Sequence, residues 1–115
     1  MGRRLLEGGN ETREIDMTNT EYVKSEMEIG YHLIPAHMRD AVERYVLNGT
    51  PPGSFLTCIL ENDFMGAAAR ADSENRSALF NWALFLTNHV PSACKGSTAR
   101  VGDWMAAGGV EQRVT

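Results

Sequence analysis

The chain has 115 residues, of which 43% are hydrophobic and 23% are charged, and its formal net charge is −4. These values fit one small globular domain, and the acidic charge argues against a protein that binds nucleic acids in general. Cys58 and Cys94 lack CxxC spacing, and no apolar run resembles a signal peptide or a membrane span. We therefore expect reduced thiols, no membrane contact and a cytoplasmic protein.

Residues 1–30 are predicted to form a flexible acidic arm. They contain four Lys/Arg and seven Asp/Glu with few large apolar side chains, so they cannot bury enough surface to fold alone. Met17 begins "MTNTEYVKSEMEIG", so residues 1–16 can be vector-derived or come from an upstream start, and no function is assigned to them. A weak helical pattern covers residues 19–29 and rests on Tyr22, Val23 and Met27.

Residues 31–109 are predicted to form an all-α domain, a compact bundle of about four helices, followed by a tail at 110–115. The predicted helices cover about 35–48, 54–71, 73–89 and 97–107. Pro35 suits the start of the first helix, and Asn48-Gly49 suits its end. On its polar side, Arg39/Glu43 and Asp40/Arg44 are predicted ion pairs four residues apart.

The fourth helix is predicted to be capped by Ser97 and to end at Gly108-Gly109. The third predicted helix contains "ALFNWALFL" and is apolar nearly all round. One face carries Leu79, Trp82, Ala83 and Leu86, and a second face carries Phe80 and Leu84. Such a helix is either central in its domain or shared with a partner, and in so short a chain we expect both. The pattern therefore predicts a homo-oligomer with Phe80, Leu84 and Trp82 as candidate interface residues.

The loop at 49–55, with the sequence "PPGSFL" at its end, is a candidate anion site. The unpaired backbone N–H groups at the start of the next helix carry positive potential and can hold a phosphate or a carboxylate. Nearby arginines would supply opposite charge, and the ring of Tyr31, Tyr45 or Phe55 would stack on a base. The candidate ligand-binding residues are Gly53, Ser54, Phe55, Arg70, Asp72, Arg76 and Tyr45. A plain turn is the alternative, with Ser54 as a cap, Asp72 or Ser73 capping the third helix, and Arg70 bridging to Asp72 or Glu74.

The sequence gives little support for catalysis, metal binding or sequence-specific DNA binding. His32, His37 and His89 share no helix face with a carboxylate at a metal-ligand spacing, and neither cysteine lies in a nucleophile motif. A helix-turn-helix over 35–71 would carry only Arg70 as a basic residue on its recognition helix. We expect no enzymatic activity, no cofactor, no metal and no specific DNA binding.

Residues 34–109 contain, in this order, an Ile-Pro helix start, "PGSFL", "L.ND", "RAD..N", an asparagine before "P..C", and "GS...V..W". In these elements the chain resembles a family of small, mostly uncharacterised proteins encoded by tailed phages and prophages. The resemblance implies no established reaction. Phage proteins of this size commonly modify host metabolism or block host defence, and some small helical oligomers sequester cyclic oligonucleotide signals.

Two functions follow as hypotheses. The first is a non-enzymatic phage-type protein that binds a small anionic ligand such as a cyclic nucleotide and so acts on a host pathway or defence. The second is an interaction module that binds and inhibits one host protein, through the exposed side of the third helix or through the acidic arm.

Overall fold

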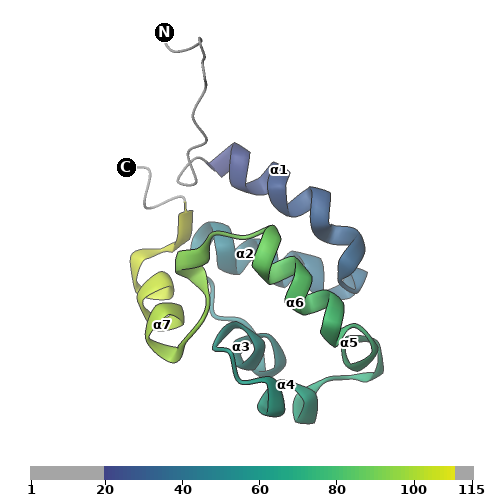
Figure 1. Cartoon of the computed structure of the whole chain (residues 1–115). Helices are drawn as coiled ribbons and strands as arrows, with labels where there is room; N and C mark the ends of the chain where they lie inside the picture. The colour runs from purple at the N-terminus through teal and green to yellow at the C-terminus, as the bar shows by residue number, and fades with distance from the viewer. Residues whose placement is uncertain (1–19, 111–115) are drawn as a thin grey trace, which may run out of the picture.

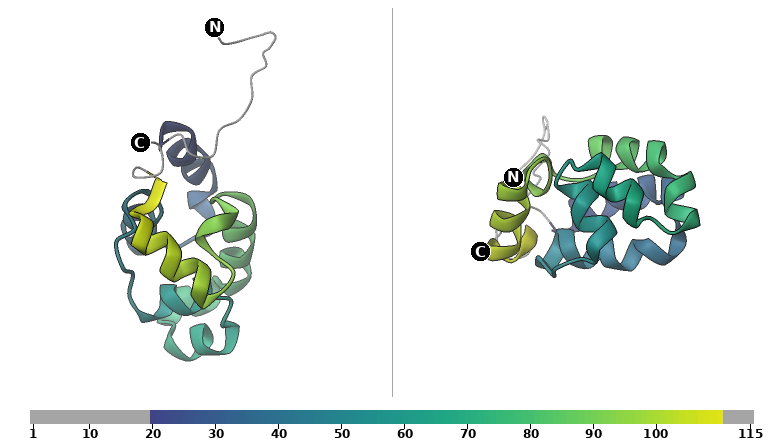
Figure 2. Two further views of the ribbon diagram at one scale, coloured as in Figure 1. Left: turned by 90° about the vertical axis from the view of Figure 1, so that its left-hand side faces the viewer. Right: turned by 90° about the horizontal axis from the view of Figure 1, so that it is seen from below.

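The computed structural model describes residues 20–110, and that range contains helices and turns but no β-strand (Figure 1). The predicted all-α class and compact form are confirmed, but the range holds seven α-helices where about four were expected. These are α1 Thr20–Gly30, α2 Arg39–Asn48, α3 Ser54–Leu60, α4 Phe64–Arg70, α5 Ser73–Ser77, α6 Leu79–Asn88 and α7 Thr98–Ala107. Three short 3₁₀ turns cover Tyr31–Leu33, Ala36–Met38 and Ser92–Cys94. Figure 2 shows that α7 and α5 lie at opposite ends of the molecule.

The helix α1 occupies the last part of the predicted flexible arm. It buries Val23 and Met27 completely and contacts α2 and α6. Gly30, at its end, packs so closely on His89 that an added Cβ would lie 2.5 Å from the ring. The weak helical pattern at 19–29 was therefore correct, and the folded part of the chain starts earlier than the predicted boundary at residue 31. The rest of the predicted arm, residues 1–19, lies outside the described residues.

The helix α2 ends as the sequence predicts. Gly49 takes the left-handed conformation (φ 74°), and its N–H is directed to the carbonyl oxygens of Arg44 and Tyr45. The predicted ion pair between Asp40 and Arg44 forms at 3.1 Å. The predicted pair between Arg39 and Glu43 was wrong, because Glu43 instead accepts a hydrogen bond from the Tyr31 hydroxyl at 3.1 Å.

The predicted helix at 54–71 is broken into α3 and α4, so that prediction was wrong. The break lies at Asn62, which takes a left-handed conformation (φ 68°) that asparagine tolerates better than most residues. Asp63 then caps α4 by accepting a hydrogen bond from the Gly66 N–H at 2.9 Å. The two helices fold back on each other and make the most extensive helix contact in the described range.

The predicted helix at 73–89 is also divided, into α5 and α6, with Ala78 between them. The sequence predicted Asp72 or Ser73 as the cap of this helix. Asp72 is the cap, and it accepts a hydrogen bond from the Asn75 N–H at 2.8 Å. The Asn75 side chain is only 2% exposed, and its Oδ1 accepts a hydrogen bond from the Trp82 indole at 3.0 Å. This buried bond ties α5 to α6 across the break.

The helix α7 closes the core against α2. Ser97 caps it, as predicted, by accepting a hydrogen bond from the Arg100 N–H at 3.1 Å. The indole of Trp104 donates to the carbonyl oxygens of Tyr45 and Val46, each at 3.2 Å. Val110, placed in the tail by the sequence, is completely buried. The domain therefore includes at least one residue beyond the predicted boundary at 109.

Candidate functional site

The predicted anion loop exposes Gly53 and Ser54 but carries no side-chain cap. Gly53 is the residue before α3, and nothing lies within 4 Å of a Cβ built on it. Ser54 is the first residue of the helix rather than its cap, and its side chain makes none of the hydrogen bonds found at the other predicted caps. The predicted capping role of Ser54 was therefore wrong.

Two of the three aromatic candidates for base stacking lie in the core, whereas the third, Tyr31, is half-buried and stacks on Phe85 with ring centroids 6.1 Å apart. Tyr45 is completely buried, and its hydroxyl donates to the Cys94 carbonyl oxygen at 2.6 Å. Burial raises the pKa of the Tyr45 hydroxyl well above its ordinary value. Phe55 is 7% exposed and packs edge-on against Trp82, with ring centroids 5.6 Å apart. Neither ring can stack on a ligand without unfolding part of the core, so both assignments were wrong.

The charged candidates at the junction of α4 and α5 do not converge on one ligand position. Arg70 donates to the Gly66 carbonyl oxygen at 3.2 Å, and Arg76 donates to the Ala71 carbonyl oxygen at 2.8 Å. The predicted bridge from Arg70 to Asp72 or Glu74 is not formed among the described residues. Asp72 serves as the helix cap, as the structural alternative expected.

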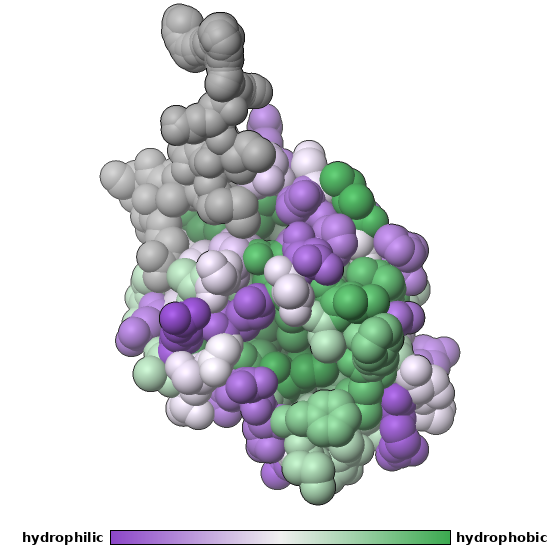
Figure 3. All heavy atoms as spheres, viewed as in Figure 1, coloured by the Kyte–Doolittle hydropathy of each residue, from purple (hydrophilic) through white to green (hydrophobic). Residues whose placement is uncertain are grey.

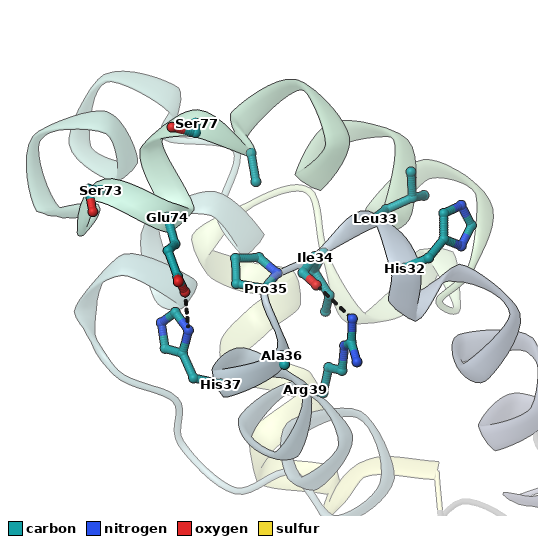
Figure 4. A pocket seen from close by; sticks show the side chains of 11 residues that line it. His32, Leu33, Ile34, Pro35, Ala36, His37, Arg39, Ser73, Glu74 and Ser77 are labelled. Atoms are coloured by element: carbon teal, nitrogen blue, oxygen red, sulfur yellow. Dashed lines mark hydrogen bonds and ion pairs between the residues drawn. The ribbon is translucent and has the colours of Figure 1, made fainter.

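Asp72 and Glu74 meet His37, a contact that the sequence did not reveal. His37 Nε2 lies 2.9 Å from Asp72 Oδ2, and His37 Nδ1 lies 3.0 Å from Glu74 Oε1 (Figure 4 marks the second contact). All three side chains are largely exposed. The contact joins the turn before α2 to the start of α5, 35 residues later in the chain. No local sequence pattern signals a pair so far apart.

Hydrogen bonds to the charged form lower the pKa of Asp72. The Asn75 backbone N–H is the largest cause, and the His37 side chain adds to it. A carboxylate whose pKa is lower in the folded chain than in the unfolded chain stabilises the fold at pH values above the unfolded pKa, which is near 3.8. This stabilisation is lost as the pH falls through the folded pKa.

We therefore expect the variant Asp72→Ala to be less stable than the wild type at pH 7, because it loses the cap and the His37 contact. The difference should shrink steadily below about pH 4, where the wild-type carboxylate becomes protonated. Thermal unfolding from pH 2 to pH 7, followed by circular dichroism, measures this. A stability difference that stays constant across that range would contradict the assigned role.

An open pocket of about 790 Å³ lies beside this contact. One wall is the segment before α2, and the other wall is α5 with the residue that follows it (Figure 4). The lining residues are His32, Leu33, Ile34, Pro35, Ala36, His37, Arg39, Ser73, Glu74, Ser77 and Ala78. Sequence reasoning assigned none of them to a ligand site. Its volume is within the range of about 300–1,000 Å³ that is usual for small-molecule sites.

A second feature is an apolar surface on α4 and α6. Four large hydrophobic side chains on these helices are exposed, and we call them the α4–α6 surface. They are Phe64 (58% exposed), Met65 (78%), Phe80 (75%) and Leu84 (36%). Figure 3 shows hydrophobic residues gathered over α6 and continuing to the corner formed by α3 and α4. The predicted second apolar face of the third helix thus has two exposed side chains.

Trp82 does not belong to that surface. It is completely buried, and its ring packs edge-on against Phe85 with centroids 6.2 Å apart. Trp82 lies two residues from Phe80 and two residues from Leu84 in the sequence, a spacing that places its side chain on the opposite side of α6. Its assignment to the oligomer interface was therefore wrong.

The described residues offer no metal site and no helix able to span a membrane. Within residues 20–110, His, Cys, Asp and Glu side chains form no group of three that could hold a metal ion. No helix in this range is long and apolar enough for a membrane span. Cys94 is completely buried, and burial raises the pKa of its thiol to about 12, which makes it a poor nucleophile.

No family model, no curated protein and no solved structure matches the chain. The resemblance to phage-encoded proteins therefore stays a prediction from the sequence motifs.

Proposed function

We propose that this chain is a non-enzymatic binding protein whose working surface is the α4–α6 surface. The carrying observation is that four of the five large hydrophobic side chains that are exposed in residues 20–110 lie on α4 and α6, with Phe80 and Met65 at least three-quarters exposed; the fifth is Ile29 on α1. Single exposed hydrophobic side chains are common, whereas a group of them on neighbouring helices is typical of a protein-binding site.

The partner that we expect is a second copy of the chain. If a large side chain presents about 200 Å² when fully exposed, the four residues together expose roughly 500 Å² of apolar area. One side of a standard interface buries about 800 Å². In homodimer interfaces roughly two-thirds of the buried area is apolar. The α4–α6 surface therefore matches what a stable dimer needs, and it agrees with the homo-oligomer predicted from the sequence.

The two hypotheses from the sequence receive unequal support. Nucleotide binding at loop 49–55 loses two of its three candidate stacking residues, because Tyr45 and Phe55 are buried. Inhibition of a host protein agrees with the exposed α4–α6 surface, and a host protein would compete there with the second copy. Action on a host pathway or defence rests on the resemblance to phage proteins alone.

Copurification tests the surface directly. Tagged and untagged chains are expressed together, and we expect the untagged wild type to be retained with the tagged wild type. Phe80→Glu in both chains should abolish retention, because a buried carboxylate without a partner is strongly unfavourable. Ala106→Glu introduces the same charge at an exposed position of α7, at the end of the molecule opposite α5. This control should leave retention unchanged. Equal loss with both variants would contradict the assignment.

A further inference from the structure

Arg39 is a half-buried cation without a charged partner. Among the described residues, its one hydrogen bond runs from Nη2 to the Ile34 carbonyl oxygen at 3.2 Å. Its guanidinium lies 5.9 Å from the centre of the Tyr31 ring, which holds the group in place. The Nε atom is buried and has no hydrogen-bond partner. Buried unsatisfied donors are rare in folded proteins, and they mark places where a water or an ion can bind nearby.

Arg39 is one of the residues that line the open pocket. In Figure 4 the open pocket has Pro35 and Ile34 at its centre, with Arg39 at one side and the His37–Glu74 pair at another. The centre of the pocket is therefore apolar, whereas its rim is charged and polar. This arrangement suits a ligand with an apolar body and one charged end.

The charges on the rim select the kind of anion. His37 is already bound by two carboxylates, Asp72 and Glu74, so it offers no free ring nitrogen to a ligand. Arg39 is left as a single unpaired positive charge, and the carboxylates would repel a doubly charged phosphate. A planar guanidinium pairs well with a carboxylate, through parallel hydrogen bonds.

We propose that the pocket between the segment before α2 and helix α5 binds a carboxylate on an apolar body, with Arg39 as the group that holds the carboxylate. Such a ligand is a small organic acid or the carboxyl end of a peptide, since both present a carboxylate next to an apolar group. This site is separate from the α4–α6 surface and does not depend on the proposed dimer.

The test uses two probes that differ only in charge. N-acetyl-phenylalanine carries a carboxylate beside an aromatic ring, and N-acetyl-phenylalanine amide replaces the carboxylate by a neutral amide. Each is titrated into the ¹⁵N-labelled full chain up to about 20 mM and followed by nuclear magnetic resonance. Ligand efficiency for a molecule of this size predicts a dissociation constant on the order of 1 mM for the acid. The amide should bind at least tenfold more weakly.

Two readouts assign the binding to Arg39. In the wild type, the resonance of the Arg39 Nε–H should shift with the acid together with backbone resonances of residues 32–39 and 73–78. In the variant Arg39→Gln, binding of the acid should weaken at least tenfold. Arg44→Gln removes a positive charge from the same helix, outside the pocket, and should leave binding unchanged.

Three results would overturn the proposal. These are no shifts at 20 mM with either the acid or a peptide that has a free carboxyl end, equal affinity for acid and amide, or shifts that fall outside the pocket segments. If Arg39→Gln does not fold, the shift of the Arg39 Nε–H in the wild type decides between binding at this site and its absence. A small acid that fails while a peptide with a free carboxyl end binds at the same residues would support the proposal and identify the source.

Discussion

Replacing Trp82 by alanine is expected to lower the free energy of unfolding by about 4 kcal/mol, the usual cost of removing a buried indole. Trp82 is completely buried and packs edge-on against both Phe55 and Phe85. Its Nε1–H also donates to the side chain of Asn75, which is 2% exposed. The substitution therefore opens a cavity and leaves a buried amide oxygen without its partner.

Urea unfolding followed by circular dichroism measures this loss. Phe80→Ala, two residues earlier on the same helix, is the matched control, because Phe80 is 75% exposed. Measured where the chain is monomeric, the control should change stability by less than about 0.5 kcal/mol. If Trp82→Ala dissociated an oligomer but left the monomer equally stable, Trp82 would belong to the interface after all.

Replacing Gly109 by alanine is expected to cost about 3 kcal/mol, since two effects combine. Gly109 has a left-handed backbone (φ 76°), which strains any residue with a Cβ. An added Cβ would also lie 2.6 Å from the backbone nitrogens of Asn48 and Gly49. Backbone atoms cannot rotate away as a flexible side chain can, so α7 would have to separate from the end of α2.

The matched control for this prediction is Gly102→Ala, inside α7. Nothing lies within 4 Å of a Cβ at Gly102, so the substitution should stabilise the chain by about 0.5–1 kcal/mol through helix propensity. Thermal unfolding of both variants gives opposite signs if the account is correct. Destabilisation by both, or by neither, would mean that the contact between α7 and α2 is not as described.

The features that the sequence predicted correctly are local ones. A cap depends on residues within one turn, and both Ser97 and Asp72 accept the expected N–H three residues later. The end of α2 at Gly49 follows from the same kind of short-range rule. These predictions need no knowledge of the rest of the fold.

The breaks in the long predicted helices were missed for a physical reason. The apolar spacing continues through residues 61–63, so periodicity alone favours one helix. Asn62 and Asp63 are poor helix formers, so their position in the middle of a predicted helix needs a reason. The reason is that Asp63 starts a new helix, which folds back so that Ala67 is buried.

The site was harder to predict than the fold. Tyr45 lies on the apolar stripe of α2, and its hydroxyl is satisfied by a backbone carbonyl of residue 94, so a stacking role was not needed to explain it. The His37 contact and the pocket at Arg39 join segments about 35 residues apart. Spacing along the chain carries no signal for such pairs, and an alignment of relatives would have been required to see them.

Light scattering of the unmodified full chain, measured after size-exclusion chromatography from about 1 to 100 µM, tests the central claim most directly. The α4–α6 surface predicts a dimer or higher oligomer in this range, and Phe80→Glu should shift the mass to that of one chain, 12.7 kDa. A wild type that scatters as a 12.7 kDa monomer at every concentration would contradict the claim that this surface binds a second copy.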